Sequence, residues 1–136
     1  MMKILQPAGW AKPKGFSNGI AVKGGTTIYI AGQIAFNSKS IIEEKTFAGQ
    51  FRQTLKNTLA VLAEAGGRPE HIVRMTWYIL DKKEYLGAIK EVGAAYRELI
   101  GRHYPAMAVV QVGALIEDDA KLEIETTAVV PEENPS

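Results

Sequence analysis

Two apolar runs near the end of the chain constrain its fold more than any other feature. They cover residues 106–115 and 122–130, are rich in β-branched residues, and are separated by an acidic break at 117–119. Valine, isoleucine and threonine suit the pleated, packed surface of a sheet, so we predict two strands connected by the break. Side chains alternate along a strand, and this places Glu123 and Glu125 together on the face opposite the apolar one.

The middle of the chain alternates between helical and strand-like patterns. Apolar residues recur every three or four positions over 47–63, after the capping residue Thr46, and again over 81–101. Each pattern predicts an amphipathic helix of about five turns. Between them, residues 71–80 are almost continuously apolar, which predicts a strand buried on both faces.

Glycines organise the predicted strands nearer the start. Gly24-Gly25 lies between short apolar runs at 19–22 and 27–31, which predicts a β-hairpin. Gly32 follows the second run directly, and a glycine at a strand end is typical of a bulge or of close approach by another group.

Residues 1–14 are rich in proline and glycine, so we expect an extended segment with an edge strand at 3–6. Trp10 and Phe16 are expected to pin this region to the core, or alternatively to line a cleft. At the other end, residues 131–136 are expected to form a loose tail.

The resulting order is strand, strand, helix, strand, helix, strand, strand. Two helices can cover one face of a single mixed sheet, so we predict one two-layer α+β domain spanning residues 1–136, without internal repeats. The second face of that sheet would expose apolar strand residues unless another subunit covered it. An oligomer is therefore expected.

Composition excludes several classes of function. Sixteen basic and fifteen acidic side chains leave a net charge of +1, which does not indicate a nucleic-acid or membrane surface. The absence of cysteine excludes disulfides, thiolate nucleophiles and cysteine-based zinc sites. No apolar run reaches the roughly 20 residues of a membrane span, and the first residues do not resemble a signal peptide, so a cytoplasmic location is expected.

Few residues offer chemistry. The two histidines, His71 and His103, lack metal-ligand spacing and are expected to be a capping or surface residue and a turn residue. Neither a nucleophilic serine elbow nor a phosphate-binding loop is present. Glu123 and Glu125 are the remaining acid–base candidates, and their alternative interpretation is a solvated strand face.

An ordered set of segments resembles the reactive intermediate deaminase family, also called Rid, YjgF-like or L-PSP endoribonuclease proteins. The resemblance extends from about residue 14 to residue 130. It is carried by Ile30-Ala31-Gly32-Gln33-Ile34, the helix at 53–66, the strand at 72–80, Tyr104-Pro105-Ala106 through Val112, and Lys121-Leu122-Glu123-Ile124-Glu125 followed by Ala128-Val129.

This resemblance implies a chorismate-mutase-like fold and a homotrimer with three clefts between subunits. It also implies hydrolysis of enamine or imine intermediates, such as 2-aminoacrylate, to a keto acid and ammonia, with no metal or cofactor. In the family, an arginine after the Pro-Ala pair binds the substrate carboxylate, for which a bidentate guanidinium is well suited. A glutamate on the last strand handles the water.

The family's site residues match this chain only in part. Glu123 matches the water-handling glutamate, and Gly32 and Gln33 match the glycine-glutamine pair. Four polar substrate contacts are replaced: the arginine by Met107, the tyrosine by Phe16, the serine before the glycine by Ala31, and the asparagine on the second helix by Gly93.

These replacements predict an arginine-lacking member whose substrate differs from 2-aminoacrylate, because a buried carboxylate without its cation costs several kcal/mol. The pocket is expected to suit a less polar ligand, with Trp10 as a further lining residue and Trp77 in either the pocket or the core. The alternatives are a non-catalytic module that binds a small metabolite or a partner protein, and, with less support, a ribonuclease. No nucleic-acid or membrane partner is expected.

Overall fold

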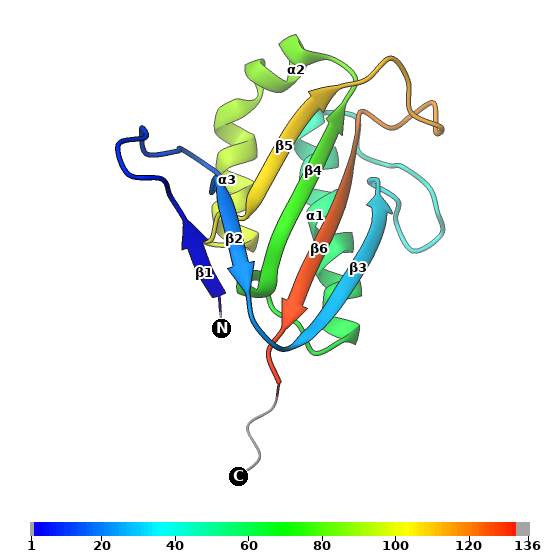
Figure 1. Cartoon of the computed structure of the whole chain (residues 1–136). Helices are drawn as coiled ribbons and strands as arrows, with labels where there is room; N and C mark the ends of the chain where they lie inside the picture. Colours follow the sequence, from blue (N-terminus) through cyan, green and yellow to red (C-terminus); the bar gives the residue numbers. More distant parts are fainter. Residues whose placement is uncertain (1, 133–136) are drawn as a thin grey trace.

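The computed structural model describes residues 2–132, which form a four-stranded mixed sheet with helices packed on one face (Figure 1). The first two strands form a separate two-stranded sheet, so the predicted single sheet is divided. Residues 133–136 of the predicted tail lie outside the described residues. The strands are β1 (Met2–Leu5), β2 (Gly19–Val22), β3 (Thr26–Gln33), β4 (Ile72–Ile79), β5 (Ala106–Gln111) and β6 (Leu122–Val130). The helices are α1 (Phe47–Glu64), α2 (Lys82–Gly87) and α3 (Ile89–Leu99), with a 3-10 turn at Pro69–His71.

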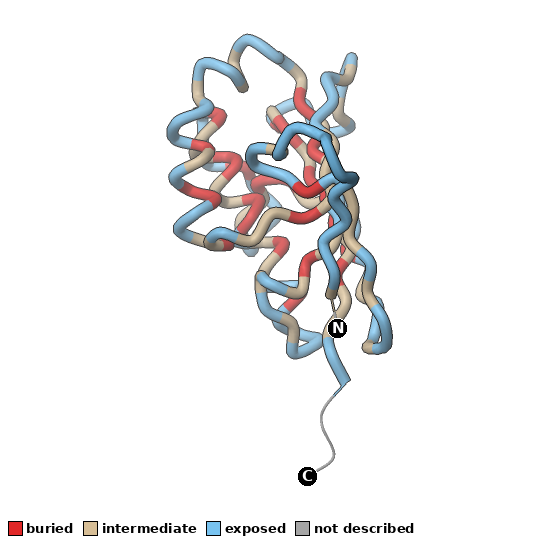
Figure 2. Tube along the Cα trace, turned by 60° about the vertical axis from the view of Figure 1, so that its left-hand side comes forward, coloured by how far each residue is buried: buried red, intermediate tan, exposed pale blue. Residues whose placement is uncertain are grey.

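The main sheet has the strand order β3-β6-β4-β5, in which β6 is antiparallel to both of its neighbours and β5 is parallel to β4. Its inner face packs on α1 and α3, and buried positions gather between the helices and the sheet (Figure 2). Fully buried side chains from both layers meet there, among them Phe51, Leu55, Met75, Leu122 and Ile124. The predicted two-layer α+β architecture is confirmed.

Helix α1 forms as its sequence pattern predicts. Thr46 caps it, since its hydroxyl oxygen accepts a hydrogen bond from the backbone N–H of Gly49 at 3.0 Å. Phe47, Phe51 and Leu55 recur at four-residue spacing and are buried against the sheet. The helix therefore supplies one wall of the core.

The predicted hairpin around Gly24-Gly25 is wrong. β2 pairs with β1, whereas β3 pairs with β6. Both glycines have positive φ, and Gly25 lies against the backbone of Val130, so the turn directs the chain towards the last strand. The nine-residue β6 offers β3 a longer hydrogen-bonded partner than the four-residue β2 could.

The second predicted helix is divided into α2 and α3 at Ala88. Asp81 caps α2, as its carboxylate accepts hydrogen bonds from the backbone of Lys83 and Glu84 at 2.9 and 3.2 Å. Gly87 ends this short helix, and glycine is a poor helix former. The division lets α3 pack along α1 independently of α2.

The strands formed by the two apolar runs near the end of the chain are not neighbours, because β4 lies between β5 and β6. β5 ends at Gln111, earlier than predicted, and a ten-residue connection from 112 to 121 leads to β6.

The prediction that β4 is buried on both faces is also wrong. Met75, Trp77 and Ile79 face the helices, whereas the alternate residues are half-buried or exposed on the other face.

That second face of the sheet is open within one chain. It carries apolar and charged side chains together, including Tyr29, which is 82% exposed, Val110, Arg74 and Glu125. Among residues 2–132, no helix combines the length and apolar character needed to cross a membrane.

Candidate functional site

The carboxylate of Glu123 lies against the backbone of Gly32, where β6 begins and β3 ends. A β-carbon built at Gly32 would be 2.2 Å from Oε2 of Glu123, so only glycine leaves room for this carboxylate. The pairing of β3 with β6 shifts register between Ile30 and Gln33, which confirms the predicted bulge. The bulge thus brings a half-buried carboxylate next to exposed backbone.

Three residues predicted for the site, Ala31, Gly32 and Gln33, follow one another at this bulge. The Gln33 amide donates to the carbonyl oxygen of Ala31 at 3.1 Å. Just beyond, the side chain of Asn57 on α1 donates to the carbonyl oxygens of Ile34 and Phe36 at 2.9 and 2.8 Å. Asn57 therefore anchors the segment that follows the bulge.

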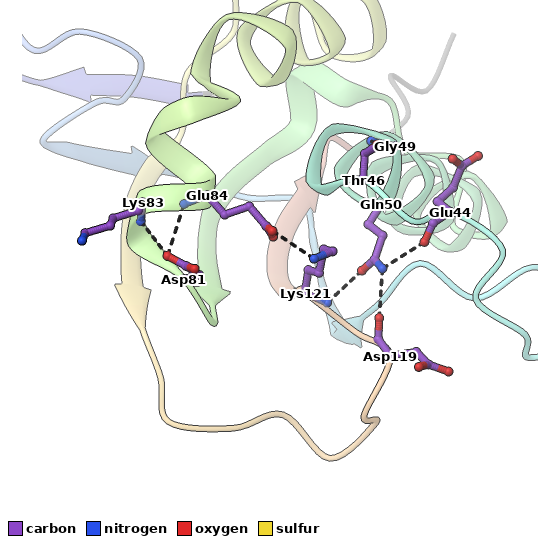
Figure 3. Close-up of polar contacts among 9 residues, drawn as sticks. All are labelled: Glu44, Thr46, Gly49, Gln50, Asp81, Lys83, Glu84, Asp119 and Lys121. Atoms are coloured by element: carbon purple, nitrogen blue, oxygen red, sulfur yellow. Dashed lines mark hydrogen bonds and ion pairs between the residues drawn. The ribbon is translucent and has the colours of Figure 1, made fainter.

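Gln50 on α1 holds the segment that leads into β6, the strand that carries Glu123 (Figure 3). This buried amide donates to the carbonyl oxygens of Glu44 and Asp119, at 3.1 and 2.9 Å, and accepts from the Lys121 backbone at 2.8 Å. Lys121 also forms an ion pair with Glu84 at 3.0 Å. Sequence reasoning missed Gln50 and Asn57, because polar residues on a helix are ordinarily expected on its solvated side.

Glu125 lies on the same face as Glu123 but in different surroundings. It is exposed and accepts a hydrogen bond from the Tyr78 hydroxyl at 3.3 Å. Its negative charge raises the pKa of Tyr78, because a phenolate beside a carboxylate is disfavoured. The solvated-face interpretation therefore fits Glu125, whereas Glu123 is held against the bulge.

An open pocket of about 590 Å³ lies on the helix side of the sheet, beside β5. Three residues predicted for the site, Phe16, Gly93 and Met107, line it. Its remaining walls combine aromatic and aliphatic side chains with two cations, and comprise Lys14, Gly15, Trp77, Tyr85, Ile89, Val92, Tyr96, Arg97, Tyr104 and Val109.

Trp77 belongs to both the core and this pocket. It is 5% exposed and packs edge-to-face on Phe51, with ring centroids 4.8 Å apart. Its indole N–H is buried without an acceptor in the described part of the chain. Trp77 is therefore both a core residue and a pocket-lining residue, the two roles that the sequence left open.

The expectation that Trp10 and Phe16 pin the first residues to the core is wrong for the chain by itself. Trp10 is 63% exposed and is not among the residues of this chain that line the pocket beside β5, so its role in the pocket stays a prediction. Phe16 is 39% exposed and lines the pocket instead. The segment is held by backbone and polar contacts, including the Ser17 hydroxyl bonded to the carbonyl oxygen of Tyr104 at 2.6 Å.

The predicted site residues thus form two groups that one chain does not bring together. Glu123 faces the open side of the sheet, whereas Met107 faces the helices. Because β4 lies between β5 and β6, Glu123 and Met107 are about 10 Å apart across the sheet. Glu123 pairs with Tyr78 and Met107 with Met75, which separates them by about a further 10 Å along the strands.

Arg97 is the pocket residue that sequence reasoning missed. A β-carbon at Gly93 would lie 3.2 Å from its Nη1, so the guanidinium passes directly over this glycine. Its position could have been found from its four-residue spacing from Gly93, since residues four apart share one face of a helix.

Both histidines have structural roles. His71 Nδ1 accepts a hydrogen bond from the Arg68 backbone at 2.9 Å, which confirms the capping prediction. His103 donates from Nε2 to the carbonyl oxygen of Ile72 at 2.5 Å, in a loop between α3 and β5. Within residues 2–132, no cluster of three or more His, Asp or Glu residues could hold a metal ion.

The chain is similar to known proteins along most of its length. The sequence family described as Endoribonuclease L-PSP matches residues 11–130. A RutC family protein of Synechocystis is 33% identical over 133 residues, which cover 96% of this chain and 98% of the relative. The 2-iminobutanoate/2-iminopropanoate deaminase of Escherichia coli K12 is 33% identical over 108 residues, covering 77% of this chain and 80% of the enzyme.

Solved structures agree with these sequence matches. The YyfB protein of the Rid family from Yersinia pestis superposes with a TM-score of 0.82 at 30% identity, covering 95% of this chain and 98% of that protein. The YjgF gene product of Escherichia coli superposes with a TM-score of 0.66 at 33% identity, covering 84% and 87%.

Proposed function

The chain belongs to the Rid family, whose relatives include 2-iminobutanoate/2-iminopropanoate deaminases, and on this basis we propose that it hydrolyses a reactive imine or enamine. Water adds to the carbon of the C=N bond, and ammonia leaves as a carbonyl group forms. Such a reaction needs a group that orients water and accepts its proton, and a surface that holds the organic part of the substrate.

The observation that carries this proposal is the placement of Glu123 against Gly32. A carboxylate held beside exposed backbone can accept a hydrogen bond from water and remove its proton as the water attacks. Gln50 and Asn57 support the segments on either side, which suits a group that must hold one position.

The separation of the two residue groups supports a site completed by a second copy of the chain. A small imino acid is shorter than the span from Glu123 to Met107, and these residues face opposite sides of the sheet. If both groups act on one substrate, they come from different subunits. We therefore propose a homotrimer whose clefts each combine the Glu123 side of one chain with the Met107 side of the next.

The pocket chemistry supports a substrate other than 2-aminoacrylate. Met107 and Phe16 line the pocket and offer no hydrogen bond to a polar substrate group. Gly93 offers no side chain at all. A small and strongly polar imino acid would leave most of this apolar lining without contact.

The test is keto-acid release from imines generated in situ. An amino acid oxidase with catalase would supply imines from several amino acids, and semicarbazide would trap whatever is not hydrolysed. We expect the protein to accelerate keto-acid release and Glu123→Gln to abolish the acceleration.

Glu125→Gln is the matched control, because it changes the same functional group on the same face of β6. It should retain activity. Full activity in Glu123→Gln would contradict the proposed role, and a monomer in solution would contradict the shared cleft. Ligand-dependent thermal stabilisation without turnover of any imine would favour the alternative of a binding module.

A further inference from the structure

The lining that one chain gives the pocket beside β5 contains cations but no anions. Arg97 and Lys14 are the charged residues in its lining, and no aspartate or glutamate lines it. Neither cation makes a hydrogen bond or ion pair with another residue in the range 2–132. An apolar pocket with unpaired positive charge at its wall is complementary to an anion with an apolar body.

Arg97 enters the pocket because position 93 has no side chain. The two residues are one helical turn apart on α3, and side chains on a helix lean towards its N-terminus. The guanidinium therefore extends over Gly93, 3.2 Å from where a β-carbon would be. Any other residue at position 93 would compete with Arg97 for this space.

The aromatic residues of the lining suit an aromatic group. Tyr96 and Tyr104 stack with ring centroids 5.5 Å apart, and Tyr85 meets Trp77 edge-to-face at 6.5 Å. Aromatic rings prefer such stacked and edge contacts with other rings. The volume of about 590 Å³ is within the range of pockets for drug-sized ligands, well beyond the needs of a three-carbon acid.

We propose that this pocket binds a monocarboxylate with an aromatic side chain, and that Arg97 on α3 binds the carboxylate. The positive charge is thereby supplied from the helix, across from the strand position that Met107 occupies. This inference rests on the proposed function when it is extended to turnover: the substrate would be the 2-imino acid formed from an aromatic amino acid.

The binding test uses 3-phenylpropanoate and its neutral amide, which differ only in charge at one end. Calorimetry on the wild-type protein should show the acid binding about tenfold or more tightly than the amide, and more tightly than propanoate. Arg97→Met should weaken binding of the acid by a similar factor and remove the preference over the amide. Arg102→Met, which changes an exposed arginine outside the pocket, should leave both affinities unchanged.

Arg97→Gln is the second variant, because it keeps a polar side chain while removing the charge and the guanidinium. An acid preference that persists in both Arg97 variants would overturn the inference. Imines from phenylalanine and alanine then separate the two proposals. Binding as described without hydrolysis of either imine contradicts the proposed function alone, whereas hydrolysis of the alanine imine with no binding of 3-phenylpropanoate contradicts the inference alone.

Discussion

The carboxylate of Glu123 occupies the space in which a side chain at Gly32 would begin, since Oε2 lies 2.2 Å from the ideal β-carbon position. Gly32→Ala would therefore displace this carboxylate. We expect imine hydrolysis to fall by about 10- to 100-fold, because a shift of about 1 Å in a reacting group is enough for such a loss. The free energy of unfolding should change by less than about 1 kcal/mol, because the atom displaced is the free end of a flexible side chain.

Gly113→Ala is the control for this substitution. No atom lies within 4 Å of a β-carbon at that exposed loop position, so activity and stability should both stay at the wild-type level. Equal activity of Gly32→Ala and the wild type would show that the contact with Glu123 does not matter for the reaction.

Gln50 connects α1 to the segment that leads into β6. Gln50→Leu would leave the N–H of Lys121 and the carbonyl oxygens of Glu44 and Asp119 without this partner. Since buried groups without partners are costly, we expect the free energy of unfolding to fall by about 2–4 kcal/mol in chemical denaturation.

Lys56→Leu provides the comparison on the same helix, at an exposed position. Its free energy of unfolding should stay within about 0.5 kcal/mol of the wild type. Equal free energies of unfolding for Gln50→Leu and the wild type would mean that the three hydrogen bonds of Gln50 add nothing to stability.

Local patterns predicted the features that depend on neighbours in the sequence. The α1 helix with its Thr46 cap, the alternating faces of β6 and the bulge at Gly32 all follow from residues a few positions apart. The division between α2 and α3 was missed because the apolar spacing continues through Ala88, whose backbone leaves the helical conformation between the two helices.

Long-range relationships were harder to predict. Gly24-Gly25 is compatible with a hairpin, yet β3 pairs with the long strand β6, about 100 residues later in the sequence. The two groups of site residues looked like one pocket in the sequence, since nothing local records on which side of the sheet Met107 lies. Arg97 was missed because it is exposed, as a charged residue on a helix ordinarily is, although its guanidinium also passes over Gly93 at the pocket.

Replacing Gly93 should stabilise the fold and weaken ligand binding. It lies inside α3, where alanine is favoured over glycine, so Gly93→Ala should raise the free energy of unfolding by about 0.5–1 kcal/mol. The added β-carbon, 3.2 Å from Nη1, would push the Arg97 guanidinium aside and weaken binding of 3-phenylpropanoate. Calorimetry and denaturation on the same variant test both effects, and unchanged affinity would show that Arg97 does not depend on this space.

Tyr96 should make stability sensitive to alkaline pH. Its hydroxyl donates to the carbonyl oxygen of His103 at 2.5 Å, and burial, followed by the nearby Tyr104, raises its pKa above the ordinary value of 10.0. As the pH rises past about 10, Tyr96 loses its proton in the unfolded state but keeps it in the folded one. The unfolded state then binds fewer protons, so stability falls with pH, by up to about 1.4 kcal/mol per pH unit from this group.

Tyr96→Phe keeps the ring and removes the titrating hydroxyl. Near pH 7 the variant should be about 1 kcal/mol less stable than the wild type, because the hydrogen bond is lost. Between pH 10 and the raised pKa of Tyr96 this difference should shrink, as only the wild type loses the contribution of this hydroxyl. Tyr29→Phe, at an exposed position on the open face, should follow the wild-type curve. Urea denaturation from pH 7 to pH 11 measures all three proteins, and a constant difference between Tyr96→Phe and the wild type would show that Tyr96 ionises alike in both states.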